Sequence, residues 1–181
     1  MKLDLTKKKI LLMLMGGASL CFVRSPKKYF KILKLIGKEW SRISDKEINK
    51  KIKSLYNSKL VKVKTEKDGT IVLVLSNEGK SRVLRYKLEE MRIKIQRWDK
   101  KWRIVIFDIP EEQKAARDAL RLRLKRLGFY ELQKSVFVHP FDCKDEVDFI
   151  TEFYQVTPFI RYGLLSSIDN DLHLRRIFDL S

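Results

Sequence analysis

The sequence predicts an α+β fold in two parts, three helices with a β-hairpin and then a unit of order βαββαβ. Three observations predict this division. Apolar residues recur at helical spacing before residue 58, short alternating strands and two helices follow residue 102, and positive charge is concentrated in the first part. We place the domains at residues 1–76 and 102–181, joined by a connector helix over residues 77–101.

Three helices are predicted before the hairpin. The first covers residues 5–23 and is apolar around much of its circumference, which indicates a mostly buried helix. The second covers residues 26–40 and begins with a Ser-Pro pair, a typical helix start. The third begins near Asp45, because Ser44 and Glu47 have the spacing of a capping box.

The hairpin and the connector complete the first part. Residues 60–74 contain two alternating strands joined at Asp68-Gly69, a pair typical of type I′ turns. Residues 76–97 have a helical and heavily charged pattern with a thin apolar stripe. Such a helix either packs against its own domain or pairs with its twin in a dimer, and the pattern leaves both alternatives open.

Positive charge distinguishes the two parts of the chain. Residues 1–103 hold 29 lysines and arginines against 10 aspartates and glutamates, whereas residues 104–181 hold 11 against 13. The formal net charge is +17. A basic part joined to a nearly neutral part indicates that one module meets a polyanion and the other has a different task.

Three helices followed by a two-stranded hairpin is the order of a winged helix-turn-helix domain. In that arrangement the third helix enters the major groove of DNA and the hairpin touches the backbone. The third helix has Ile48, Ile52 and Leu55 on one arc and a lysine-rich face opposite. A solvated surface is the alternative explanation for such a face. The candidate DNA-binding residues are Lys46, Asn49, Lys50, Lys53, Asn57, Lys62, Lys64 and Lys67.

The two asparagines in this set are the side chains best suited to reading a base. Lysine contacts to phosphate position a protein on DNA, whereas contacts to base edges specify the sequence. Asn49 and Asn57 have the amide groups that pair with adenine. Either of them alternatively caps or solvates a helix end.

The second part begins with a buried strand over residues 102–109 that ends near a carboxylate, Asp108. A helix starts at Pro110 and stops at Gly128, where a left-handed residue is expected. The remaining predicted elements are strands at 129–132 and 135–141, a helix at 144–154, a strand at 159–166 and a tail helix at 170–180. This order is the ferredoxin-like pattern βαββαβ.

Three motifs in the second part resemble a known family. They are Phe107-Asp108-Ile109-Pro110, Leu127-Gly128-Phe129 and Gln133-Lys134-Ser135-Val136-Phe137, and over residues 102–166 they are similar to the CRISPR-associated adaptation subunit Cas-two. With a basic winged helix placed before this domain, the chain resembles the PaaX-like repressors. That resemblance is carried by Trp102, Asp108-Ile109-Pro110, Arg117-Asp118, Leu127-Gly128-Phe129 and Ser135.

The resemblance implies a DNA-binding transcriptional regulator, a repressor that binds duplex DNA as a homodimer. The full-length repressors continue with a further C-terminal domain that this sequence does not show, so no effector ligand is assigned. The alternatives from the same resemblance are a metal-dependent nuclease and a CRISPR adaptation scaffold that holds DNA without cutting it.

Asp108 is the one candidate catalytic and metal-binding residue. The resemblance implies that Asp108 from two subunits could hold a magnesium ion, and magnesium needs several oxygen ligands. The alternative is a carboxylate that caps the helix beginning near Pro110. The sequence leaves open whether the protein is an enzyme and favours a protein without catalytic activity or cofactor. Magnesium is required only under the alternative of a magnesium-dependent endonuclease.

Other chemistries and compartments find little support in the sequence. Cys21 and Cys143 lie far apart, His139 and His173 match no zinc spacing with them, and no Gly-rich phosphate loop occurs. The basic and apolar run over residues 7–19 imitates a signal peptide, but no cleavage site follows and the run is too short for a membrane span. We therefore expect a cytoplasmic protein without a membrane partner.

Overall fold

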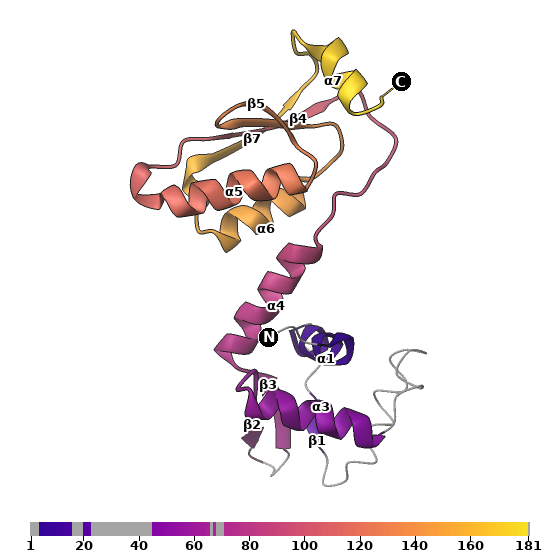
Figure 1. Cartoon of the computed structure of the whole chain (residues 1–181), viewed down its shortest axis with the longest axis vertical. Coiled ribbons are helices and arrows are strands. Elements are labelled where there is room, and N and C mark those ends of the chain that lie inside the picture. Colours follow the sequence, from indigo (N-terminus) through magenta and orange to yellow (C-terminus); the bar gives the residue numbers. More distant parts are fainter. Residues whose placement is uncertain (1–3, 16–19, 23–44, 66, 68–70, 181) are drawn as a thin grey trace. The chain divides into compact units, whose positions relative to one another are not determined.

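A computed structural model of the chain describes residues 4–15, 20–22, 45–65, 67 and 71–180. The α+β class is confirmed, and the chain divides into two compact units, Met1–Glu89 and Glu90–Ser181, here called unit 1 and unit 2 (Figure 1). The predicted helix over residues 26–40, the cap residue Ser44 and the Asp68-Gly69 turn lie outside the described residues.

Unit 1 contains helices around a small antiparallel sheet. Its described elements are α1 (Leu5–Met15), β1 (Leu20–Phe22), α3 (Asp45–Asn57), β2 (Val61–Thr65), β3 (Ile71–Leu75) and α4 (Asn77–Glu90). The strand order is β1-β3-β2, with β3 in the centre. The predicted third helix and the two hairpin strands are confirmed.

The prediction of one long helix over residues 5–23 is wrong at its C-terminal end. Helix α1 stops at Met15, and Leu20 lies opposite Leu73 as β1 pairs antiparallel with β3. The sequence continues from Met15 with two glycines, which are poor helix formers. Leu20, Cys21 and Phe22 then gain more from main-chain pairing with β3 than from a continued helix.

The core of unit 1 joins its helices to its hairpin. Leu11 of α1, Leu55 of α3, Leu73 of β3 and Val83 of α4 belong to one buried cluster. Each of these side chains is at most 1% exposed. Because Val83 packs in this core, α4 is anchored to unit 1. Of the two alternatives for the connector helix, this is packing against its own domain.

A tight connection fixes α3 against the hairpin. The chain leaves α3 through Lys59 in the left-handed conformation (φ 59°), where the Leu60 N–H donates to the Leu55 carbonyl at 3.0 Å. Ser76 reaches back to the same turn, donating its hydroxyl to the Lys59 carbonyl at 2.6 Å. Gly79 sits directly on this turn, since a Cβ there would lie 2.0 Å from the Leu60 carbonyl oxygen. The end of α3, the start of β2 and the start of α4 therefore form one rigid junction.

Unit 2 has the predicted order βαββαβ. Its elements are β4 (Trp102–Phe107), a 3-10 turn η2 (Glu111–Gln113), α5 (Lys114–Arg126), β5 (Tyr130–Gln133), β6 (Val136–His139), α6 (Lys144–Phe153), a second 3-10 turn η3 (Thr157–Phe159), β7 (Ile160–Leu165) and α7 (Asp171–Ile177). The sheet order is β5-β6-β4-β7, and all its neighbouring strands are antiparallel. Gly128 ends α5 with φ 90°, as the sequence predicts.

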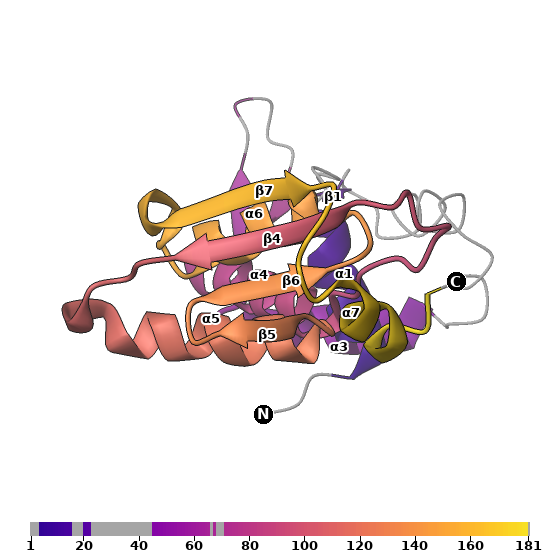
Figure 2. The same ribbon diagram turned by 90° about the horizontal axis from the view of Figure 1, so that it is seen from above.

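The two faces of this sheet are covered differently. Helices α5 and α6 lie along one face, while α7 lies over one end of the other face (Figures 1 and 2). Leu174 of α7 packs there on Trp102 and Val138. Further along the same face, Ile106 of β4 is 43% exposed. This sheet face therefore exposes an apolar side chain away from α7.

The connector helix is shorter than the sequence predicts. Helix α4 ends at Glu90, and residues 91–99 form neither helix nor strand. The predicted apolar stripe of this helix extended to Ile95, whose side chain is 81% exposed. The stripe therefore ends within α4, because nothing in the described part of the chain packs on Ile95 to extend the helix.

Candidate nucleic-acid interface

Helix α3 separates apolar from cationic side chains, as predicted. Ile48 and Leu55 are buried in the core of unit 1, whereas Lys46, Lys50 and Lys53 are exposed on the opposite side. Among the residues that the structure describes, no carboxylate pairs with these three lysines. We call Lys46, Lys50 and Lys53 the α3 lysine face. Within the described residues, the charge of this face is therefore not balanced by a carboxylate.

A groove between α1 and α3 adjoins this face. It has a volume of about 420 Å³ and is lined by Lys7, Lys46, Glu47, Lys50, Lys51 and Ser54. The structure therefore brings two predicted residues, Lys46 and Lys50, together with two lysines that the sequence did not single out. Lys7 belongs to the basic run that imitates a signal peptide, and only the packing of α1 against α3 places it here.

A second groove lies where α3 meets the hairpin. It has a volume of about 700 Å³ and is lined by Tyr56, Asn57, Lys59, Val61, Lys62, Ser76, Asn77 and Glu78. Asn57 of α3 and Lys62 of β2, both predicted interface residues, thus share one surface. Lys59 was not predicted, because its position depends on the left-handed turn that ends α3.

The remaining predicted residues are less closely grouped. Val61 faces the core, so Lys62 and Lys64 project from the other face of β2, opposite Val74 and Val72. Lys67 is exposed beyond the strand. The side chain of Asn49 lies outside the described residues. The hairpin lysines therefore do not continue the α3 lysine face. Lys62 shares a groove with Asn57 at the end of α3, but with none of the three lysines of that face.

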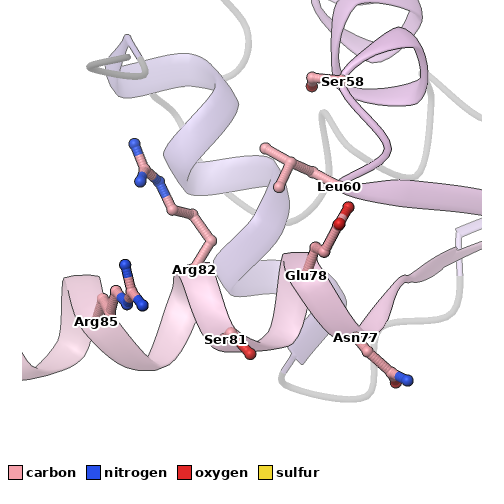
Figure 3. Close-up of a pocket in the computed structure, with 7 residues that line it drawn as sticks. All are labelled: Ser58, Leu60, Asn77, Glu78, Ser81, Arg82 and Arg85. Atoms are coloured by element: carbon pink, nitrogen blue, oxygen red, sulfur yellow. The ribbon is translucent and has the colours of Figure 1, made fainter.

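A pocket of about 600 Å³ lies between the end of α3 and α4. It is lined by Ser58, Leu60, Asn77, Glu78, Ser81, Arg82 and Arg85 (Figure 3). Arg82 and Arg85 project from α4 to the same side, whereas Ser81 points away. The Arg82 Nε donates to the Tyr86 hydroxyl at 3.1 Å, and Glu78 adds a carboxylate to the lining. The pocket thus has two arginines and one carboxylate, whereas the groove beside α1 has four lysines and one carboxylate.

Asp108 occupies a different setting from the one expected of a helix cap. The N-cap residues are Pro110 for the 3-10 turn and Gln113 for α5, and neither end has a side-chain cap hydrogen bond. The capping prediction is therefore wrong, because the extended Pro110 and the intervening turn separate Asp108 from the start of α5. Its carboxylate is exposed, and its backbone N–H donates to the Phe159 carbonyl at 3.1 Å.

Metal ligands do not gather within the described residues, where no group of three or more histidines, cysteines, aspartates or glutamates could hold an ion. Unit 2 also buries His139, Cys143 and Arg103. Burial lowers the pKa of His139 to about 4 and raises the pKa of Cys143 to about 12. Arg103 is held by Asp99 at 2.6 Å and also donates to the Pro140 carbonyl at 2.8 Å.

Comparison with known families identifies the second unit. Residues 95–170 match the PaaX protein central Cas2-like domain. The match spans β4 to β7, including both helices on the sheet, so this part of the chain carries a Cas2-like domain, as the resemblance from the sequence implied. No curated protein matches the chain. None of the helices within the described residues is long and apolar enough to cross a membrane.

Proposed function

We propose that the protein is a DNA-binding transcriptional regulator of the PaaX-like type, a repressor that binds duplex DNA through unit 1. The single observation that carries this proposal is the α3 lysine face. Three exposed lysines lie on one side of an amphipathic helix, and no carboxylate of the described residues neutralises them. A face of this kind suits the phosphates that border the major groove.

The arrangement of unit 1 supports a winged helix-turn-helix domain. The order of α1, β1, α3, β2 and β3, with β1 and β2 on either side of β3, fits helices that carry a hairpin behind the recognition helix. The rigid junction at Ser76 and Gly79 holds α3 and β2 in fixed relation. A helix that reads a groove needs such support, because register on DNA depends on its orientation.

Unit 2 supports the regulator proposal in two ways. It matches the PaaX protein central Cas2-like domain, and the word central indicates that other parts of the PaaX protein lie on either side of this domain. Its open sheet face, with Ile106 exposed and Ile104 and Val136 half-buried, offers an apolar surface to a second copy. In the proposed homodimer, unit 2 holds two copies together so that two units 1 reach two half-sites.

Electrostatics dominates the expected affinity. Lys46, Lys50, Lys53 and Lys62 would release about four counterions, which corresponds to a slope of about −3.6 in a plot of log K against log salt concentration. Base reading is assigned to Asn57, the predicted asparagine whose exposed side chain the structure describes. Binding should therefore weaken steeply with salt and depend modestly on sequence.

Duplex binding by fluorescence anisotropy tests this proposal. The double variant Lys50→Ala/Lys53→Ala should bind at least tenfold more weakly at low salt, with a salt slope reduced by about 1.8. The matched control Lys114→Ala/Lys134→Ala removes the same charge from unit 2, and its affinity should stay within twofold of the wild type. Equal losses in both variants would indicate a general charge effect and contradict a specific role of α3.

Selection of bound sequences from a random duplex pool tests the regulator and dimer parts of the proposal. A palindromic consensus with half-sites about one helical turn apart is expected. The same protein incubated with magnesium and labelled DNA should leave it intact. Cleavage that Asp108→Ala abolishes would overturn the proposal in favour of a nuclease, and the absence of any consensus would favour a scaffold.

A further inference from the structure

We propose that the groove between α1 and α3 is a binding site for a backbone phosphate of duplex DNA, with Lys7 as its central cation. This inference rests on the proposed DNA binding and adds a second element, α1, to the interface. None of Lys7, Lys51 and Ser54 is among the DNA-binding residues that the sequence predicts.

The first argument is charge. The groove collects four lysines, Lys7, Lys46, Lys50 and Lys51. One carboxylate, Glu47, lines it, and a second, Asp4, lies 3.0 Å from the Lys51 Nζ and 4.0 Å from the Lys7 Nζ. Four cations against two anions leave an excess of about two positive charges, which is a local field that attracts a phosphodiester.

The second argument is preorganisation. Lys7 is held in place, because its Nζ donates to the Ser54 Oγ at 2.7 Å across the two helices. Its side chain is only 15% exposed. Asp4 accepts the Lys7 N–H at 3.1 Å and so caps α1 while its other oxygen holds Lys51. A lysine that is already fixed loses less conformational entropy when it binds a phosphate than a freely moving one.

The third argument is position relative to the proposed docking of α3. The major groove is about 12 Å wide, similar to the diameter of a helix with its side chains, so a helix inside it has a phosphate backbone along each flank. On α3, Lys46 and Lys50 belong both to the outward lysine face and to the groove beside α1. Ser54 and Lys51 continue around the helix towards α1. Lys7 therefore lies on one flank of α3, where one DNA strand would pass.

We choose a phosphodiester over a free small anion because the groove is continuous with the α3 lysine face. Two of the four lysines are shared with the surface proposed to meet DNA, so an anion in the groove would be part of the same duplex. The pocket beside α4 lacks this continuity, because its lining includes neither a lysine of the α3 face nor a residue of α1.

Duplex binding by three variants of the full chain tests the inference. Lys7→Ala should weaken binding about threefold to tenfold at low salt and reduce the salt slope by about 0.9, the loss of one phosphate contact. Lys7→Arg keeps the charge and should restore affinity to within about threefold. Lys114→Ala, a single cation removed from unit 2, should change neither quantity.

A variant with the opposite sign separates phosphate binding from a structural role of Lys7. Glu47→Gln removes the carboxylate that lines the groove while keeping a side chain of the same shape, and it should tighten duplex binding about twofold to fivefold. Thermal unfolding of each variant shows whether Lys7→Ala merely loosens α1. If Lys7→Ala lowers the unfolding temperature, the effect of Glu47→Gln on duplex binding decides between phosphate binding and a structural role of Lys7.

The outcomes distinguish this inference from the proposed function. If Lys50→Ala/Lys53→Ala weakens binding but Lys7→Ala and Glu47→Gln both bind as the wild type does, the groove is not a phosphate site and the regulator proposal stands. If none of the variants changes duplex binding, the α3 interface itself is wrong.

Discussion

The two units of this chain use their positive charge in different ways. Unit 1 has 23 lysines and arginines against 8 carboxylates, whereas unit 2 has 17 against 15. In unit 2 many of these cations are paired with a carboxylate of the same unit. The pairs are Arg103 with Asp99, Lys114 and Arg117 with Glu111, Arg121 with Asp118, Lys125 with Glu131, Lys144 with Asp148 and Arg175 with Asp171.

Because of this difference, the number of basic residues alone is a poor guide to which unit could bind nucleic acid. Exposed ion pairs contribute little to stability, but each one cancels its own long-range field. Helix α5 has six basic residues, yet ion pairs hold four of them, Lys114, Arg117, Arg121 and Lys125. Helix α3 has fewer cations, and its lysine face has no such partners among the described residues.

The largest expected effect comes from the junction that supports α3. Gly79→Ala would place a Cβ 2.0 Å from the Leu60 carbonyl oxygen, a backbone atom that cannot move without disturbing the junction. We expect a loss of about 3 kcal/mol or more in the stability of unit 1, together with loss of duplex binding. Calorimetry of the full chain should show the unfolding transition of unit 1 shifted to lower temperature and that of unit 2 retained.

Gly163→Ala in unit 2 is the matched control. Its added Cβ would lie 3.1 Å from the Ile104 Cγ2, a side-chain atom that can yield by a few tenths of an ångström. Its effect should be below about 1.5 kcal/mol. Equal destabilisation by the two variants would contradict the rigid junction.

A second large difference concerns pH, because both histidines of the chain lie in unit 2. Burial lowers the pKa of His139 from 6.5 to about 4, so the folded unit keeps this imidazole neutral while the unfolded chain protonates it. The stability of unit 2 is therefore unaffected by this imidazole above pH 6.5. As the pH falls from 6.5 towards 4, protonation of the unfolded chain lowers the free energy of unfolding of unit 2. The loss should reach about 3 kcal/mol in unit 2.

Urea unfolding between pH 4.5 and 7.5 checks this expectation. The stability of unit 1 should stay nearly constant over the range, and that of unit 2 should fall. His139→Gln should be less stable at pH 7 but should flatten the pH dependence of unit 2. An unchanged slope in this variant would assign the pH dependence to other groups.

A smaller effect contrasts two aspartates that each hold a cation. In unit 2, a hydrogen bond from Arg103 lowers the pKa of Asp99, and this stabilises the fold above pH 3.8. Asp99→Asn leaves the buried Arg103 without its carboxylate and should cost about 1–2 kcal/mol without changing duplex binding. Thermal unfolding at pH 7 together with anisotropy measures both quantities.

In unit 1 the corresponding variant is Asp4→Asn. Burial raises the pKa of Asp4, but hydrogen bonds from Lys51 and the Lys7 N–H outweigh it and lower the pKa overall. Asparagine still caps α1, so the loss of stability should stay near about 0.5 kcal/mol. Duplex binding should become about twofold tighter, because Lys7 and Lys51 lose their counter-charge. Weaker binding would contradict a cationic role of this groove.

Much of the fold could be predicted from the sequence where a local pattern determines it. The spacing of Ile48, Ile52 and Leu55 is enough to define α3, and the alternation from Trp102 to Phe107 defines β4. Gly128 marks the end of α5 because few other residues adopt its backbone conformation. In each case the determining residues lie within one element.

The elements that the sequence predicted wrongly depend instead on contacts with residues outside the element. Strand β1 exists because β3 offers it a partner some fifty residues later in the chain, as the pairing of Leu20 with Leu73 shows. Helix α4 ends where its packing partners end, which the stripe up to Ile95 does not reveal. In the candidate site, Lys46, Lys50 and Lys53 are found from periodicity alone. Lys7 is found only once α1 packs against α3.

The most direct test of the account is lysine reactivity in the full chain with and without a saturating DNA duplex. Brief acetylation followed by mass spectrometry should show protection of Lys46, Lys50 and Lys53 on α3. Lys114 and Lys144 in unit 2 should react equally in both samples. Protection confined to unit 2, or no protection of the α3 lysines while the duplex is bound, would contradict the central proposal that unit 1 presents the α3 lysine face to DNA.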